Sequence, residues 1–129
     1  MFGLGGGMRN EAFPALRKIF WAVYVAALIV SSLTPVDLSG APEDSDKAMH
    51  LLAYLLLVAL WPAAWRRPGP VMFGFAAGLG VALEVAQGLL PTGRFADPWD
   101  ALANCLGAGL GLAVLRFARA RRNCAEGRP

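Results

Sequence analysis

Apolar residues along this chain are gathered into four blocks, separated by short polar or proline-containing stretches. The blocks cover residues 15–33, 48–65, 71–90 and 101–117. A helix that crosses the hydrocarbon core of a bilayer needs about 20 mostly apolar residues, within a range of roughly 17–25, and each block approaches that length. The pattern therefore predicts an all-α membrane protein, a bundle of four transmembrane helices.

Two local signals refine these boundaries. Asp97 followed by Pro98 is typical of an N-cap and the first position of a helix, so the fourth helix is expected to begin there. Pro62 falls in the last turn of the second predicted helix and is expected to kink it. The first block could alternatively be a signal peptide. It has no small-x-small cleavage site, however, and Pro35 follows at once, so we expect an uncleaved span.

Composition supports a membrane protein with little soluble mass. The chain is 57% hydrophobic and 16% charged, whereas a soluble domain carries about 25% charged residues. The stretches between the blocks are too short for a soluble domain. We therefore predict one membrane domain over residues 15–117, preceded by a disordered segment 1–14 and followed by a basic cytoplasmic tail 118–129.

The distribution of basic residues predicts how the bundle is oriented. Most arginines and lysines lie before or at the start of the first block, between the second and the third, or at the end of the fourth and after it, and the other two loops are mainly acidic. The positive-inside rule then places both termini in the cytoplasm of a multi-pass protein of the cell membrane. The net charge of +3 fits anionic inner-leaflet lipid, and no nucleic-acid partner is expected. Cys105 is expected near the outer end of the fourth span and Cys124 in the cytoplasmic tail, too far apart to pair.

Polar residues in or beside the blocks collect, in this topology, at the outer ends of the helices. An ionisable group inside a span costs roughly 2.5–3.5 kcal/mol on insertion scales, so such residues are candidates for function. Residues three and four apart share a helix face. That spacing gives three stripes: Lys47, His50 and Tyr54 with Asp46 at the edge; Glu84 and Gln87 with Gly80 and Gly88; and Asp100 and Asn104 with Gly107 and Gly111.

Glycines share two of these stripes with the polar residues. Because small residues mark the places where membrane helices pack closely, we expect the second and third stripes to face the interior of the bundle. Gly74 and Gly78, four residues apart, predict a separate packing seam.

The motif residues resemble the VanZ-like family. The segment Asp46-Lys47-x-x-His50-x-x-x-Tyr54 is similar to the opening of that family's second span, and Ser32 to Pro35 is similar to the end of its first. The second half of the resemblance is carried by Glu84-x-x-Gln87, Pro91, Arg94 and Asp100-x-x-x-Asn104-x-x-Gly107. The match runs from about residue 19 to 115. The family is named for a protein that gives low-level resistance to the glycopeptide teicoplanin, so the resemblance implies a membrane fold and a function at the cell envelope, without a mechanism.

Our first hypothesis for function is a binding site. A pocket between the helices, open to the outer leaflet, would hold the polar headgroup of a membrane lipid or of a lipid-linked envelope precursor. Basic groups would contact anionic oxygens, and the amides and carboxylates would orient them. The candidate ligand-binding residues are Asp46, Lys47, His50, Tyr54, Glu84, Gln87, Arg94, Asp100 and Asn104.

Two other classes of function stay open at this point. The site could belong to an intramembrane hydrolase-like enzyme acting on a headgroup, with His50 and Glu84 as the candidate acid–base pair. It could also belong to a small proton-coupled transporter, in which a homo-oligomer would supply the missing polar path. No cofactor is expected. No metal is expected either, because one histidine among carboxylates leaves the ligand geometry unspecified.

Several candidates also have a purely structural interpretation. Asp46 could cap the second helix while Lys47 reaches the membrane surface. His50 could be a buried hydrogen-bonding histidine, Tyr54 an interfacial anchor, and Asn104 a link between helices.

Glu84 is the hardest residue to explain structurally. A carboxylate at its depth must be neutral, or paired with a base such as Lys47, Arg94 or His50. Arg94 could instead pair with Asp100 across the loop.

Overall fold

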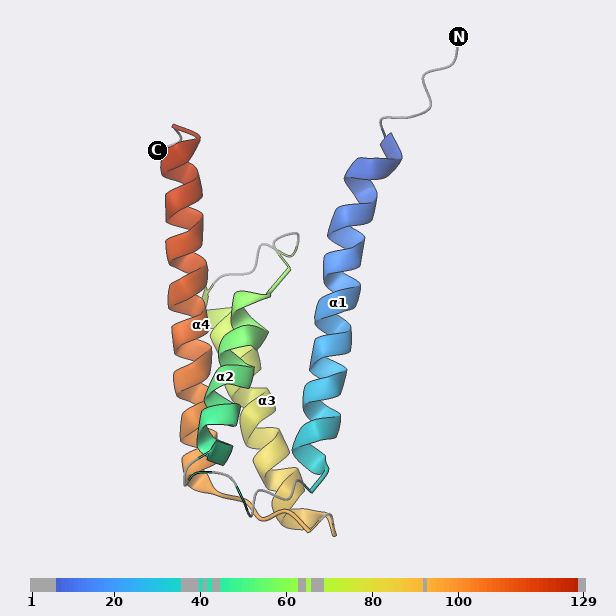
Figure 1. Ribbon diagram of the computed structural model, residues 1–129, viewed down its shortest axis with the longest axis vertical. Coiled ribbons are helices and arrows are strands. Elements are labelled where there is room, and N and C mark those ends of the chain that lie inside the picture. Colours follow the sequence, from blue (N-terminus) through green and yellow to red (C-terminus); the bar gives the residue numbers. More distant parts are fainter. Residues whose placement is uncertain are drawn as a thin grey trace.

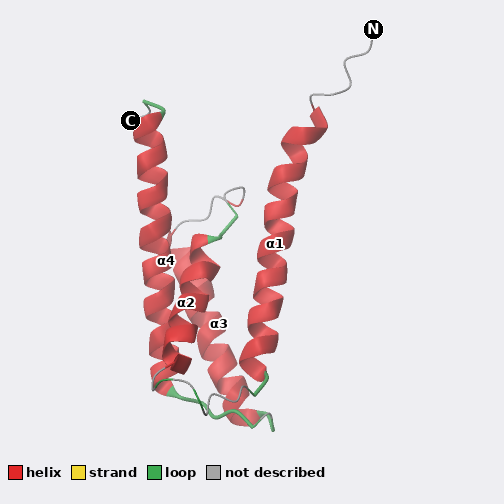
Figure 2. Cartoon of the chain, in the orientation of Figure 1, coloured by secondary structure: helices red, strands yellow, loops and turns green. Residues whose placement is uncertain are grey.

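The structure is a computed structural model that describes residues 7–35, 40, 42, 45–62, 65, 69–91 and 93–127, with side chains from residue 12 onward. The described residues form helices and no strand (Figure 2). The helices are α1 (Gly7–Leu33), α2 (Ser45–Ala59), α3 (Gly69–Leu89) and α4 (Pro98–Ala125). The predicted all-α architecture is therefore confirmed. Three helices, over Ala12–Leu33, Gly69–Leu89 and Pro98–Ala125, are long and apolar enough to cross a membrane.

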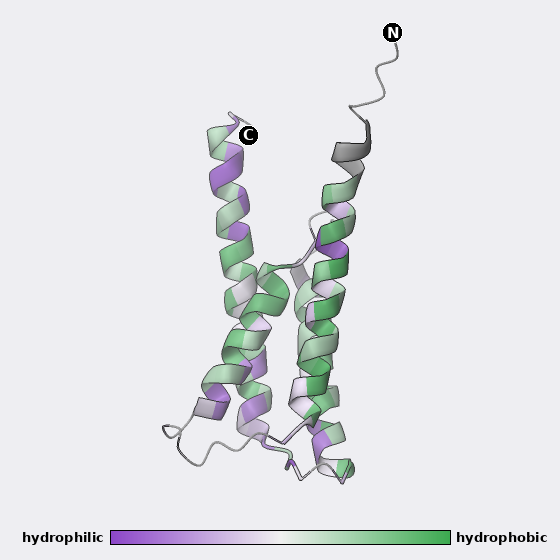
Figure 3. Ribbon diagram, turned by 45° about the vertical axis from the view of Figure 1, so that its right-hand side comes forward, coloured by the Kyte–Doolittle hydropathy of each residue, from purple (hydrophilic) through white to green (hydrophobic). Residues whose placement is uncertain are grey.

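The helices run alternately up and down, so that α1 begins and α4 ends at the same end of the bundle (Figure 1). Helix α2 packs along α4, with α3 beside them, and α1 stands further off and diverges from α4 toward its own start. Strongly hydrophilic residues lie at the end of the bundle where α2 and α4 begin, and again along the last turns of α4 (Figure 3).

Helix α2 is shorter than the sequence pattern predicted. The expected helix over residues 48–65 ends at Ala59, and Pro62 terminates it instead of kinking it. Proline has no N–H and disfavours helical backbone in the residue before it. The N–H of Trp61 accordingly donates to the carbonyl of Val58, three residues back, instead of continuing the α-helix. The 15 residues of α2 span only about 22 Å at a rise of 1.5 Å per residue. By length, α2 does not match the other three as a candidate span.

Helices α1 and α4 are longer than predicted. Helix α1 already begins at Gly7, with Pro14 inside it, so much of the expected disordered segment 1–14 is helical; residues 1–6 lie outside the described part of the chain. Helix α4 continues through the predicted basic tail as far as Ala125, because arginine and alanine favour helix. It ends before Gly127, whose φ of 62° is left-handed.

Glycines bring the backbones of α2 and α4 into direct contact. A Cβ atom at Gly107 would collide with the carbonyl oxygen of Leu51, and one at Gly111 would collide with that of Leu55. The expectation that this stripe faces the interior is confirmed, since both glycines are buried. Gly80 is buried too, but Gly88 is exposed.

The prediction that Gly74 and Gly78 form a packing seam is wrong for contacts between helices of this chain. Both residues are exposed, and a Cβ at either would meet no atom within 4 Å. The pair lies on the outward face of α3, because Met72 and Ala76 are the residues of that stretch that turn inward.

Helix α1 is attached to α2 by aromatic side chains. The Trp21 indole N–H donates to the carbonyl of Leu57 at 2.9 Å, and the Tyr24 hydroxyl donates to that of Ala53 at 2.8 Å. Trp21 also packs edge-on against Trp61, with 5.0 Å between ring centroids. Because α2 ends so soon, the Leu57 carbonyl loses its usual partner four residues on. The indole replaces that partner.

Candidate functional site

The candidate residues all gather at one end of the bundle, around the first turns of α2 and α4, the last turns of α3 and the α3–α4 loop. Buried polar and charged side chains of the described residues are found at this end only, and they are His50, Glu84, Gln87, Asp100 and Asn104. The helical stripes deduced from spacing are therefore brought together by the fold.

The start of α4 is fixed by a cap that the sequence predicted. The Asp97 side chain accepts the backbone N–H of Trp99 at 2.9 Å, and Pro98 occupies the first turn. The Lys47 ammonium lies 3.9 Å from the other Asp97 oxygen and ties α2 to the same point. With its first turn anchored, α4 presents Asp100 to the interior of the bundle.

His50 lies at the centre of the polar residues. Its Nδ1 is 3.1 Å from Asn104 Oδ1, which confirms that Asn104 links two helices. Its Nε2 faces two carboxylates, Asp100 Oδ2 at 3.6 Å and Asp46 Oδ1 at 3.8 Å. Since an amide oxygen can only accept, Nδ1 carries a proton in this arrangement.

Arg94 reaches in from the loop and pairs with a different carboxylate from the one expected. Its Nη2 lies 3.6 Å from Asp46 Oδ1, the same oxygen that faces His50. No Arg94–Asp100 pair is formed among the described residues. Asp46 sits in the first turn of α2, one residue after Ser45, where its charge also suits the helix dipole. The ion pair therefore ties the α3–α4 loop to the start of α2.

Glu84 and Gln87 bind backbone groups. Glu84 Oε2 accepts the N–H of Asp97 at 3.0 Å, and Oε1 has no hydrogen-bond partner. Of the two alternatives left open by the sequence, a neutral Glu84 or one paired with a base, the described contacts show no pairing with a basic side chain. Gln87 donates to the carbonyl of Ser32 at 2.7 Å, near the end of α1. These two side chains hold α3 to α1 and to the start of α4.

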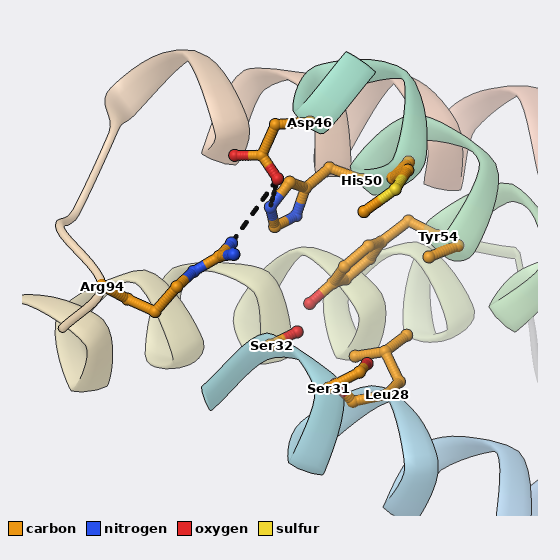
Figure 4. Close-up of a pocket in the computed structure, with 9 residues that line it drawn as sticks. Leu28, Ser31, Ser32, Asp46, His50, Tyr54 and Arg94 are labelled. Atoms are coloured by element: carbon orange, nitrogen blue, oxygen red, sulfur yellow. Dashed lines mark hydrogen bonds and ion pairs between the residues drawn. The ribbon is translucent and has the colours of Figure 1, made fainter. Parts of the chain in front are cut away.

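Tyr54 is buried and is not an interfacial anchor. Its side chain is 1% exposed, its hydroxyl has no hydrogen-bond partner, and its ring lies over Gly80. Figure 4 shows the hydroxyl pointing into the space bordered by Arg94 and Ser32. A buried hydroxyl without a partner is costly, so this group is a candidate to bind a polar atom in that space.

That space is a cavity of about 100 Å³ between α1, α2 and the α3–α4 loop. Its polar wall comes from four predicted residues, Asp46, His50, Tyr54 and Arg94. The rest of the lining, which sequence reasoning did not assign to a site, is Leu28, Ser31, Ser32, Met49 and Ala53. Only Ser32 had a signal in the sequence, as part of the motif that ends the first span.

The remaining predicted residues support the cavity from outside it. Gln87, Asp100 and Asn104 contact or face lining residues, and Glu84 holds the backbone of Asp97 beside them. Lys47 lies instead along an apolar groove between α2 and α4, lined also by Trp99 and Leu102.

Cys105 and Cys124 are both free, as their spacing predicted.

Comparison with known proteins agrees with the resemblance read from the motifs. No curated protein and no solved structure matches the chain. The family described as VanZ/LLP1, however, matches residues 12–119, which include α2, α3 and every candidate site residue. This membrane protein therefore belongs to the VanZ/LLP1 family.

Proposed function

We propose that the protein binds the polar headgroup of a membrane lipid, or of a lipid-linked envelope precursor, in the cavity beside Arg94. The observation that carries the proposal is the unpartnered Tyr54 hydroxyl, which is aimed into a cavity that also holds a guanidinium and two serines. Arginine offers a planar fork of donors that suits phosphate or carboxylate oxygens. The hydroxyl supplies a further donor at the floor of the same space.

The apolar part of the cavity suits the lipid part of such a ligand. Leu28, Met49 and Ala53 line it on the side of α1 and α2. A volume of about 100 Å³ has room for a headgroup fragment but not for a whole lipid. The chains would therefore lie along the apolar outer faces of the helices, where residues such as Val30 and Leu52 are exposed.

The orientation predicted from basic residues places this cavity at the outer leaflet. The last turns of α4 carry Arg116, Arg119, Arg121 and Arg122, and the positive-inside rule puts that end in the cytoplasm. Envelope precursors and glycopeptide antibiotics meet at the opposite, outer surface of the membrane. We therefore include a contribution to teicoplanin resistance in the proposal.

Two observations favour binding over catalysis or transport. Both ring nitrogens of His50 are directed at protein groups, Asn104 on one side and two carboxylates on the other, so neither is directed at a substrate in the cavity. The buried polar side chains of the described residues stay at one end of the bundle, whereas a transport path needs polar lining across the membrane.

The binding experiment compares lipid carried by the wild type and by Arg94→Gln. Protein extracted into nanodiscs or mild detergent is analysed by native mass spectrometry and its bound lipids are identified. We expect a defined lipid to co-purify with the wild type and to fall at least about tenfold in Arg94→Gln, which loses a charge-assisted contact. Arg122→Gln, a matched loss of charge at the other end of the bundle, should keep it. Equal lipid in all three proteins would contradict the proposal.

A labelling experiment tests orientation separately. In a Cys124→Ser background, Phe95→Cys places a thiol on the exposed α3–α4 loop. An impermeant maleimide should label it in intact cells, and should leave Cys124 of the wild type unlabelled until the cells are opened. The opposite pattern would invert the topology.

The resistance component needs its own readout. Expression of the wild type in a Gram-positive host should raise the inhibitory concentration of teicoplanin, and Arg94→Gln expressed at the same level should not. Without a rise in the wild type, the resistance component fails and headgroup binding is judged by the lipid experiment alone.

A further inference from the structure

Three side chains at the edge of the cavity place their ligand atoms around one point. They are Asp46 Oδ1, His50 Nε2 and Asp100 Oδ2, and one ligand atom from each residue lies within 4.8 Å of the others. We propose that these residues bind a divalent transition-metal cation of the Mn²⁺ or Zn²⁺ class. The inference goes beyond headgroup binding and does not depend on it.

Two of the three separations are already close to those around a bound cation, and the third, between the two carboxylates, is within 4.8 Å. Zinc–nitrogen and zinc–oxygen bonds of about 2.0–2.2 Å hold tetrahedral ligand atoms about 3.4 Å apart. The nitrogen of His50 is 3.6 Å from Asp100 and 3.8 Å from Asp46. Both separations are too long for hydrogen bonds and only a few tenths of an ångström longer than coordination requires. The sequence left this geometry unspecified, which is why no metal was expected from it.

Asn104 orients the histidine as a metal ligand is usually oriented. A ligating imidazole normally gives its other N–H to a carbonyl or carboxylate, which fixes the tautomer and the ring plane. Here Nδ1 meets Asn104 Oδ1 at 3.1 Å, so that in a neutral ring the lone pair of Nε2 faces two carboxylates. Without a positive charge between them, those three atoms repel one another.

Burial provides an independent sign of a missing partner. Asp100 is 4% exposed, its carboxylate faces the His50 ring, and its Oδ1 has no hydrogen-bond partner. Asp46 Oδ1 also makes no hydrogen bond, although the Arg94 guanidinium lies 3.6 Å from it. A carboxylate as deeply buried as that of Asp100, with a second carboxylate beside it, is strongly unfavourable unless a cation compensates it.

The surrounding charges leave room for a cation. Among the residues that the structure describes, four carboxylates stand at this end of the bundle, those of Asp46, Glu84, Asp97 and Asp100. The positive side chains nearby are Lys47 and Arg94. Arg94 shares the Asp46 oxygen that the cation would use, so guanidinium and metal compete for it.

The donor set favours a particular class of metal. Imidazole with carboxylates suits Zn²⁺, Mn²⁺ and related ions, whereas Mg²⁺ and Ca²⁺ prefer sites made of oxygen alone. The competing explanation is a protonated His50 that bridges the two carboxylates as a purely internal ion triad. The two explanations differ in whether added metal binds.

The experiment measures binding of Mn²⁺ by electron paramagnetic resonance, and of Zn²⁺ by calorimetry and thermal midpoint. The protein carries Cys124→Ser, has no polyhistidine tag, is held in mild detergent and is freed of metal by a chelator. We expect one saturable site per chain and a rise in thermal midpoint, because an ion that binds only the folded state stabilises it. Asp100→Asn and Asp46→Asn should each weaken binding at least about tenfold.

Control variants distinguish a built site from general acidity. Asp97→Asn removes a neighbouring charge and keeps the cap, since asparagine caps as well as aspartate; it should bind within about threefold of the parent protein. Arg94→Gln should bind as tightly or more tightly, because it removes the competitor. Asp46 is partly exposed, so Asp46→Asn should fold even if Asp100→Asn does not, and circular dichroism checks both.

The result that overturns the proposal is the absence of saturable binding to the parent protein. Binding that is equally strong in Asp46→Asn and in Asp97→Asn would also overturn it. Because the metal is tested alone, these results do not depend on lipid binding, and a failure of the lipid experiment would leave the metal result intact.

Discussion

Helix α2 is held on its two sides by contacts of opposite kinds. Toward α4, glycines 107 and 111 let the backbones touch, with no side chain between them. Toward α1, large aromatic side chains reach across a wider gap, and Trp21 and Tyr24 donate hydrogen bonds to carbonyls of α2. One interface depends on the absence of side chains and the other on their length.

This difference explains where the cavity lies. Where α2 and α4 touch, side chains as short as those of Asp100 and Asn104 can reach His50 from the neighbouring helix. Where α1 stands off, space remains above the Tyr54 ring, and the cavity is lined by α1 residues such as Leu28 and Ser31. Close packing of α2 against α4 assembles the polar groups, and looser packing of α1 against α2 leaves a cavity beside them.

The largest effect should come from filling the α2–α4 contact. Gly107→Ala places a methyl group against the Leu51 carbonyl, where only backbone can move. We expect the free energy of unfolding to fall by about 3 kcal/mol, or the protein not to fold. Gly74→Ala, on the open face of α3, is the matched control and should change it by less than about 0.5 kcal/mol. Denaturant unfolding in detergent compares the two, and similar losses would mean that the backbone contact is not what holds α2.

A smaller effect is expected from the polar link across the same interface. Asn104→Leu keeps approximate size but leaves the buried Nδ1–H of His50 without an acceptor. The cost should be about 2 kcal/mol, the usual range for a buried donor left unpaired being about 1–3 kcal/mol. The thermal midpoint measures it. An unchanged midpoint would indicate that the His50 ring finds another partner.

Substitutions at the aromatic interface between α1 and α2 should lower the free energy of unfolding by less. Trp21→Phe keeps an aromatic ring against Trp61 and removes only the N–H that reaches Leu57. We expect a loss of about 1 kcal/mol, the net value of one hydrogen bond. Leu16→Ala, on the exposed side of α1, provides the control in the same unfolding measurement. A loss as large as that for Gly107→Ala would remove the contrast between the two interfaces.

The smallest effect is expected at Glu84. Glu84→Gln keeps an oxygen that can accept the Asp97 N–H, so the unfolding free energy should change by less than about 0.5 kcal/mol, below the average for a whole hydrogen bond between membrane helices. A thermal midpoint far below that of the wild type would show that the charge of Glu84 stabilises the bundle. That outcome would restore the ion-pair interpretation of this residue.

The sequence by itself determined the fold class, the end of the bundle that carries the polar residues, and that the polar stripes of α3 and α4 turn inward. Length and hydropathy decide the first, because a bilayer sets the length of a span. Helical spacing decides which polar residues are buried. It predicted one buried face with Glu84 and Gln87 and another with Asp100 and Asn104, and all four side chains are buried. The Asp97–Pro98 cap was readable because capping depends on neighbouring residues alone.

Only the tertiary structure decided the partners and the cavity. Arg94 pairs with Asp46 and not Asp100, and Glu84 binds a backbone amide, because the choice among nearby groups depends on how loop and helices are placed. The early end of α2 also depended on context, since Trp21 from another helix satisfies the carbonyl freed at Leu57. Periodicity reports which face of a helix is buried, but distances between helices arise from packing, and those distances determine ion pairs, cavities and metal ligands.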